Sequence, residues 1–248
     1  MIQAYFYKKQ FMEATAFYFW LSQQSFELMP VLPFNAQQDK LLAMDFTQSN
    51  TTLTDHIIND TTAFTQYIEQ QLSAAAATYG IGGYNEHRTV YARSRVFDGV
   101  SETDARCIHL GVDIWGKAGT PVAAPLDGSV HSFAFNDAFG DYGATIILEH
   151  QINGAQFYTL YGHLSLADIT NLKEGDFIAA GKVFAHFGEP SENGQWPPHL
   201  HFQIVLDMQG KKGDYPGVCS LAERENYLNN CPDADALLNM IQWAQPVL

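Results

Sequence analysis

Four histidines and one aspartate stand at spacings that suit joint chemistry. His199 and His201 lie two residues apart in a short alternating run, so on a strand both side chains project from one face, about 6.6 Å apart at the backbone. Pro197 and Pro198 rigidify the approach to this run. One imidazole can therefore bind a metal while the other stands beside it, provided that further ligands come from elsewhere in the chain.

His109 and Asp113 are the first candidates for those further ligands. On a straight strand, residues four apart have side chains separated by about 13 Å. Joint ligation therefore requires a bend in the backbone, which Gly111 permits. The same spacing occurs at His56 and Asp60, which we interpret as a loop or a helix start without a metal.

A third element, Tyr161 to Ser165, brings His163 to the end of an apolar segment. Alone, such a histidine is more often hydrogen-bonded to backbone than catalytic. Its occurrence together with the other two elements favours a functional site. The candidate set comprises His109, Asp113, His163, His199 and His201.

These motifs resemble those of the lysostaphin and LytM-type zinc endopeptidases, which cleave peptide crosslinks of bacterial cell walls. The family's Y-x-H-L-S-like element is matched by Tyr161 to Ser165, and the run from Gly119 to Gly128 is also similar to the family's. The resemblance covers roughly residues 106 to 206. The family signature, H-x-x-x-D followed by H-x-H, is matched by His109, Asp113, His199 and His201.

The resemblance implies a division of roles among the five residues. His109, Asp113 and His201 would bind one zinc ion per chain. His163 and His199 would form the catalytic pair. Two imidazoles and one carboxylate leave the fourth tetrahedral position of zinc open, as in catalytic zinc sites. Zinc lowers the pKa of water toward about 7 and polarises a scissile carbonyl.

Proton transfer would fall to His163 or His199, because the chain has no H-E-x-x-H motif with an adjacent glutamate base. An imidazole with an unperturbed pKa near 6.5 suits this role at neutral pH. The other ring can donate a hydrogen bond to the developing oxyanion. The sequence does not assign the two roles.

Several other polar residues are candidates for supporting roles. Cys107 precedes His109 closely, but we interpret it as a small hydrophobic side chain, because a fourth protein ligand would close the zinc site. Asp141 and Glu149 are possible acceptors for a ligand imidazole. Trp196 either contacts substrate or packs under its turn. The histidines interpreted as hydrogen-bonded fillers are His131, His150 and His186.

The predicted function is a zinc-dependent metallopeptidase that hydrolyses a peptide bond, with peptidoglycan crosslink-type peptides as substrates by family resemblance. One alternative is an inactive metal-binding domain of the same fold that serves as a partner module. Another is a cytoplasmic amidohydrolase whose substrate is not a component of the cell wall. A phosphocarrier of a related fold would not need the carboxylate of Asp113.

The approach to His199 departs from the wall-cutting relatives. Gln195 to Pro198 replaces the shorter Ser/Thr-Gly-Pro lead-in of many family members. Together with the segment 213–218, it resembles the version of the family found in long chains beside kinase-like and aminotransferase domains. The resemblance does not supply the substrate of that version.

A mainly β core must position these residues. From about residue 104, β-branched and aromatic runs alternate with Gly, Pro, Asn and Asp, which predicts an antiparallel β sandwich-barrel hybrid. We expect one or two strands within 177–187. The other predicted strands cover residues 120–124, 128–135, 145–150, 157–161 and 199–206.

Three parts are predicted along the chain: a mixed N-terminal appendage with its connector (1–103), the peptidase-like domain (104–215) and a C-terminal helical extension (216–248). In the extension, helices are expected over 222–228 and 234–243.

Within the appendage, a helix is expected to begin at Asp60 to Thr62 and to end at Gly80. Residues 41–46 are expected to form a short strand. The segment 80–99, with its glycines and arginines, predicts a connector along the surface.

The charge balance excludes several classes of partner. Asp and Glu number 27 against 13 Lys and Arg, and the net charge of −14 argues against nucleic acid and anionic membranes. No apolar run approaches the roughly 18 residues of a membrane span. The expected partner is therefore a peptide substrate, and the sequence does not indicate the oligomeric state.

A cytoplasmic location is expected, although relatives of this family are often exported. Charges at Lys8, Lys9 and Glu13 interrupt any signal-peptide core between Met1 and Trp20. An odd number of cysteines fits free thiols in a reducing compartment. They are Cys107, Cys219 and Cys231.

Overall fold

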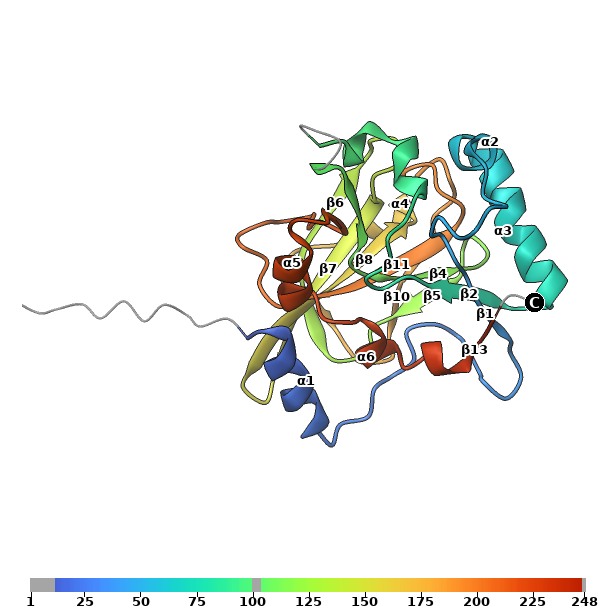
Figure 1. Cartoon of the computed structure of the whole chain (residues 1–248). Coiled ribbons are helices and arrows are strands. Elements are labelled where there is room, and N and C mark those ends of the chain that lie inside the picture. Colours follow the sequence, from blue (N-terminus) through green and yellow to red (C-terminus); the bar gives the residue numbers. More distant parts are fainter. Residues whose placement is uncertain (1–11, 100–103, 247–248) are drawn as a thin grey trace, which may run out of the picture.

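The computed structural model describes residues 12–99 and 104–246 (Figure 1). Residue 103, the predicted end of the appendage, lies outside this range, as do Lys8 and Lys9. The described residues form a mainly β protein with helices at its periphery, which confirms the predicted fold class. No helix among them is both long enough and apolar enough to cross a membrane.

The strands of the largest sheet are β1 (Leu41–Ala43), β2 (Tyr79–Gly82), β4 (Val112–Trp115), β6 (Gly128–Asn136), β7 (Gly143–Ile152), β8 (Ala155–Leu164), β9 (Phe177–Ile178), β11 (His199–Val205) and β13 (Ala244–Gln245). Two separate pairs are β3 (Arg106–His109) with β12 (Val218–Ser220), and β5 (Pro121–Ala123) with β10 (Val183–His186). The α-helices are α1 (Ala14–Ser22), α2 (Asp55–Asn59), α3 (Thr61–Ala75), α4 (Leu166–Ile169), α5 (Arg224–Asn230) and α6 (Asp235–Leu238). Short 3-10 helices are η1 (Val90–Arg93), η2 (Arg95–Phe97) and η4 (Ile241–Trp243).

In the large sheet, the strand order among the described residues is β13-β1-β2-β4-β11-β8-β7-β6-β9. All pairs from β2 to β9 are antiparallel, whereas β1 is parallel to both β2 and β13. The predicted strands are present as β5, β6, β7, β8 and β11, and the segment 177–187 contains β9 and β10.

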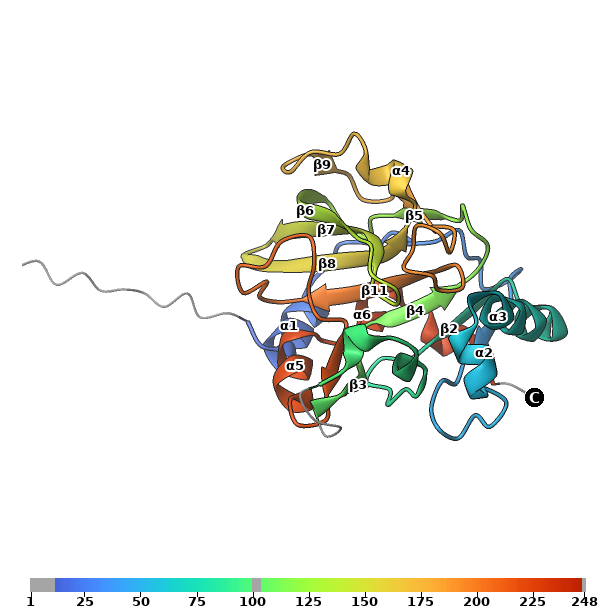
Figure 2. The ribbon, with the colours of Figure 1, turned by 90° about the horizontal axis from the view of Figure 1, so that it is seen from above.

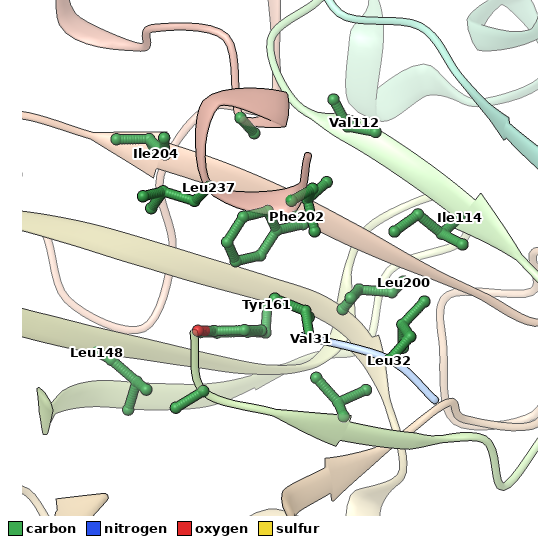
Figure 3. Packing of buried hydrophobic residues seen from close by; sticks show 14 of the residues in the cluster. Val31, Leu32, Val112, Ile114, Leu148, Tyr161, Leu200, Phe202, Ile204 and Leu237 are labelled. Atoms are coloured by element: carbon green, nitrogen blue, oxygen red, sulfur yellow. The ribbon is translucent and has the colours of Figure 1, made fainter. Parts of the chain in front are cut away.

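The alternation of β11 divides its side chains between the two faces of the sheet. Leu200, Phe202 and Ile204 belong to the main hydrophobic cluster. Figure 3 shows Leu200 and Phe202 packed with Tyr161 of β8 and with Leu237 of α6. Because successive strand residues point to opposite faces, the odd-numbered histidines of β11 project from the other side.

The appendage extends the sheet that carries the histidines. In Figure 2, β2 lies beside β4, and α2 and α3 lie at the same end of the sheet. The register sets Gly80 opposite Trp115 and Gly82 opposite Asp113. The predicted division into three parts stays a prediction, but strands from both flanking parts complete one sheet.

Two helix predictions were wrong in their boundaries. The helix expected to end at Gly80 ends at Ala75, because Ala76 adopts a left-handed conformation with a φ of 50°. Gly80 instead lies in β2. The helix expected over 234–243 is interrupted after α6 by Asn239, which is also left-handed (φ 52°).

The prediction of a surface connector over 80–99 was also wrong. Arg88, Val90, Tyr91 and Arg93 are all buried. Val90 and Tyr91 belong to a second hydrophobic cluster, where they pack with aromatic residues of the appendage and with Trp196. Local composition indicated a loop, and the loop is covered because its apolar side chains complete this cluster.

We expect Ile81→Ala to destabilise the whole β core, because Ile81 of β2 is 1% exposed and belongs to the main cluster. A buried Ile→Ala change costs about 2–5 kcal/mol of unfolding free energy. Urea unfolding followed by fluorescence and by circular dichroism should show one shared transition at lower urea. Phe19→Ala, at a side chain 70% exposed, is the control and should shift stability by less than about 0.5 kcal/mol. An unchanged transition in Ile81→Ala would show that β2 is not integral to the core.

Candidate metal centre and catalytic site

The register of β11 places His201 beside its first partner. His201 is paired with Asp113 on β4 and with Gly162 on β8. Side chains that face each other across antiparallel strands lie on the same face, with Cβ atoms about 4.5–5.5 Å apart. The pairing of the central strand therefore brings an imidazole and a carboxylate together.

A bend between β3 and β4 brings His109 to the same point. The strands are separated by Leu110 and Gly111, so the segment is not one straight strand. A Cβ atom at Gly111 would lie 2.6 Å from Cε1 of His201. Glycine is therefore needed there for the close approach of the second imidazole as well as for the bend.

Three ligand-type atoms converge on one buried position. Nε2 of His109 lies 2.9 Å from Nδ1 of His201 and 3.3 Å from Oδ1 of Asp113. Nδ1 of His201 lies 3.0 Å from the same carboxylate oxygen. The three residues are between 1% and 4% exposed. They form a group that could hold a metal ion.

In His109 and His201, the hydrogen bond of the ring nitrogen that points away from the metal group sets the protonation of the nitrogen that points into it. Nδ1 of His109 donates to the carbonyl of Gly83 at 2.8 Å. Nε2 of His201 lies 2.9 Å from Oε1 of Gln203, which accepts because the amide nitrogen of Gln203 donates to Pro216 O at 3.1 Å. The inner nitrogens are therefore lone-pair donors, and two of these with a carboxylate fit a divalent metal such as zinc.

The protonation states also suit ligation. Burial lowers the pKa of His109 to about 3, and the positive charge of Arg88 acts in the same direction. Burial raises the pKa of Asp113, but His109 and the charge of Arg88 outweigh it and hold that pKa well below its usual range. At neutral pH His109 is therefore neutral and Asp113 is ionised, which are the forms that a metal requires.

His163 and His199 form a stacked pair next to this group. Their ring centroids are 4.1 Å apart. The ring of His199 also stacks with that of Trp115, at a centroid distance of 5.7 Å. Nδ1 of His163 donates to Asn193 O at 2.8 Å, and Nδ1 of His199 donates to Pro197 O at 2.7 Å. Each ring is thereby held with Nε2 left for proton transfer.

The backbone at His163 is unusual for a residue within a strand. Its φ of 61° lies in the left-handed region, which few non-glycine residues adopt. Its amide donates to the carbonyl of Tyr142 at 2.8 Å. Such conformations cost on the order of 1–3 kcal/mol and cluster at functional sites. The end of β8 is thus turned so that His163 faces His199.

Burial keeps both rings of this pair neutral. It lowers the pKa of His199 to about 4. It also lowers the pKa of His163 well below its ordinary value, to which the neighbouring His199 contributes. Either imidazole can therefore accept a proton at neutral pH.

The five side chains line a cavity of about 200 Å³. Much of its wall is aromatic and comes from the appendage rather than from the predicted peptidase-like part. Trp196, on the loop before β11, packs on Phe64 and Tyr91 and also lines this cavity, and its predicted contact with substrate stays a prediction. The appendage residues in the wall include Phe46, Phe64, Val90, Tyr91 and Phe97.

The remaining sequence candidates lie outside the metal group. Cys107 does not belong to it. Glu149 bonds to the amides of Gln151 and Gln156 instead of to a ligand imidazole. Asp141 lines the cavity. The three filler histidines are hydrogen-bonded as expected, through Ser132 for His131, Asp127 and Thr159 for His150, and Asp168 for His186.

Residues that contact the candidate ligands were missing from the sequence predictions. Gln203 carried a signal, because it follows His201 by two residues on the same strand face. Gly83 and Arg88 carried none, because their contacts depend on the path of the connector. Tyr142, whose ring lies 5.1 Å from that of His201, was also missed.

Comparison with known proteins agrees with this geometry. Residues 107–214 match the model of peptidase family M23. This segment is similar to M23 peptidase domains. The family resemblance noted from the motifs is thereby confirmed, and the matched segment contains all five candidate site residues.

Two curated relatives illustrate the similarity. The chain is 31% identical over 137 residues to an uncharacterized metalloprotease of Haemophilus influenzae, covering 52% of this chain and 26% of that protein. It is 29% identical over 126 residues to the L-Ala–D-Glu endopeptidase of Bacillus subtilis, covering 49% of this chain and 35% of that protein. The chain thus spans only about a quarter to a third of the length of these relatives.

Among solved structures, the catalytic domain of the antimicrobial peptidase lysostaphin from Staphylococcus simulans is similar at 23% identity and a TM-score of 0.39. The match covers 66% of this chain and 96% of that domain.

We expect His109, His163 and His199 to stay neutral well below the pH at which free histidine is protonated, because burial lowers the pKa of each. In the metal-free folded chain, His199 should titrate near 4 and His109 near 3, against 6.5 for an unperturbed imidazole. The unfolded chain therefore takes up protons first, so the stability that these groups contribute above pH 6.5 falls as the pH is lowered. NMR titration of the imidazole signals measures these values, and titration of all of them near 6.5 would contradict the buried site.

Proposed function

We propose that this chain is a zinc-dependent peptidase that hydrolyses a peptide bond, with peptidoglycan-type peptides as substrates. The observation that carries the proposal is the convergence of Nε2 of His109, Nδ1 of His201 and Oδ1 of Asp113 beside a stacked pair of neutral histidines. The M23 match supports the hydrolase class. One of the similar proteins is named as an L-Ala–D-Glu endopeptidase, which supports the substrate class.

In this proposal, His109, Asp113 and His201 hold the zinc ion. When bound, zinc supplies Lewis-acid chemistry, which polarises a carbonyl and makes water more acidic. His163 and His199 hold and move protons at Nε2, since their Nδ1 atoms are engaged with backbone carbonyls. One acts as the base in its neutral form, and the other donates to the oxyanion when it carries a proton on Nε2; both rings bond through Nδ1 to a backbone carbonyl, so these bonds do not assign the two roles.

We also propose a cytoplasmic location. It is supported by the three cysteines, all of which are free in the described part of the chain. Fractionation of the source cells, with detection of this protein in the cytoplasmic and exported fractions, would test this assignment directly.

We expect His163→Ala and His199→Ala each to lower kcat/KM on a muropeptide by about 100-fold or more, because each removes a proton-transfer group. Both should still bind zinc, whereas His201→Ala should lose it. His56→Ala is the matched control, because His56 has the same spacing to a carboxylate but is exposed on α2, and it should behave as wild type.

Zinc content and turnover of these four variants and wild type are measured together. Equal turnover in His163→Ala, His199→Ala and wild type would remove the pair from the mechanism. Zinc binding without turnover in wild type, across a panel of muropeptides and glycine-rich peptides, would instead favour the inactive binding module.

A second candidate substrate class is a short soluble peptide or amide outside the intact wall. The five site side chains are between 1% and 6% exposed, and the appendage contributes much of the cavity wall. Ligand pockets typically hold about 300–1,000 Å³, and this cavity of about 200 Å³ is smaller. A buried site of this size suits a chain end better than a strand of crosslinked polymer.

We therefore expect soluble muropeptides to be cleaved at least tenfold faster than the same bonds in intact sacculi. The measurement is release of new amino termini from both substrates at matched bond concentration. Lysostaphin acting on its own substrate serves as a positive control for sacculus digestion. Equal rates on the two substrates would contradict a preference for chain ends.

A further inference from the structure

Arg88 is buried beside the metal group although it comes from the appendage. It lies between β2 and η1 and is 4% exposed. Its Nη1 donates to Oδ2 of Asp113. This is the carboxylate oxygen that does not contact the imidazoles, since His109 and His201 both approach Oδ1. The guanidinium therefore occupies one side of the carboxylate and leaves the other to the histidines.

The guanidinium is itself held at several points. Nε donates to Oε2 of Glu86 at 2.6 Å, and Nη2 donates to the carbonyl of Gly82 at 3.3 Å. Its central carbon lies 5.3 Å from the ring centre of Phe46 and 5.6 Å from that of Trp115. An arginine fixed by this many contacts can in turn fix the orientation of the carboxylate that it binds.

The turn that precedes Arg88 supports the other side of the site. Gly83 has a φ of 96°, and a Cβ atom there would lie 1.8 Å from Nη2 of Arg88. The carbonyl of the same glycine accepts from Nδ1 of His109. One short segment, residues 82–88, thus contacts two of the three ligand residues.

We propose that Arg88 is a positioning residue of the metal centre, which holds Asp113 so that Oδ1 alone faces the metal. The inference rests on the proposed zinc site. It goes beyond that proposal because it makes the appendage part of the centre: the M23 segment supplies the ligands, and residues 82–88 orient them.

Removal of Arg88 would have two opposite effects on metal affinity. The guanidinium repels a nearby divalent cation, so its loss alone would raise affinity. It also orients Asp113, and loss of a group that orients a metal ligand typically lowers affinity by about 10–100-fold. Glu86 forms an ion pair with Arg88, so changing both residues leaves the local net charge as in wild type.

The decisive variant is therefore the double substitution Glu86→Gln with Arg88→Met. It keeps the net charge and places an unbranched apolar side chain between Phe46 and Trp115. Replacement of the Glu86–Arg88 pair alone is often neutral, but Asp113 also loses its ion partner, so the metal-free variant is expected to be less stable than wild type. Arg88→Lys is the second variant, since it keeps the charge but lacks the fork that reaches Asp113 and Glu86 together.

Zinc dissociation constants of the full-length chain are measured by competition with a chromophoric chelator, and the cobalt-substituted protein is compared by its visible absorption spectrum. We expect the double variant to bind zinc about 10–100-fold more weakly than wild type and to show a changed cobalt spectrum. Arg88→Lys should show a smaller loss. Arg95→Ala, at an exposed arginine of η2, is the control and should match wild type in both measurements.

The possible results separate this inference from the proposed function. Wild-type affinity and an unchanged cobalt spectrum in the double variant and in Arg88→Lys would overturn the role of Arg88 while leaving the zinc site in place. Failure of the wild-type chain itself to bind zinc or cobalt would overturn the proposed zinc site. Thermal unfolding of each metal-free variant shows whether the fold is retained, and Arg88→Lys provides the test if the double variant does not fold.

Discussion

The structure depends on the convergence of three electron-pair donors in a buried position. Nε2 of His109, Nδ1 of His201 and Oδ1 of Asp113 lie within 3.3 Å of one another. Hydrogen bonds of the outer nitrogens, Nδ1 of His109 and Nε2 of His201, hold the ring protons there, so the inner nitrogens carry lone pairs. Such an arrangement is costly in a low-dielectric interior unless a cation fills it. The bend at Gly111, the register of β11 and the turn at Gly83 are all arranged around that requirement.

The appendage and the M23 segment act as one unit in this arrangement. Strand β2 extends the sheet beside β4, and the connector that follows it brings Gly83 and Arg88 against the ligands. The same connector supplies aromatic walls to the cavity. The same segment thus lines the cavity and contacts two of the candidate ligand residues, which links the shape of the cavity to the orientation of those side chains.

The sequence predicted the site residues better than it predicted their surroundings. Alternation along β11 predicts that its two histidines share one face, whereas the set of five was predicted from the joint occurrence of the motifs and the family resemblance that they carry. Gln203 was accessible to the same reasoning. Arg88 was not, because its contact with Asp113 depends on how a non-repetitive segment crosses the sheet. The helix predicted to end at Gly80 ended early for a similar reason: the left-handed turn at Ala76 redirects the chain into β2.

The most direct test of the account is an anomalous diffraction measurement at the zinc absorption edge on crystals of the full chain grown with zinc. We predict one strong peak bound by Nε2 of His109, Nδ1 of His201 and a single oxygen of Asp113, with zinc–nitrogen distances of about 2.0–2.1 Å. The second oxygen of Asp113 should remain on Arg88. A peak with a different set of ligands, or no peak at this position in crystals soaked with zinc, would contradict the account.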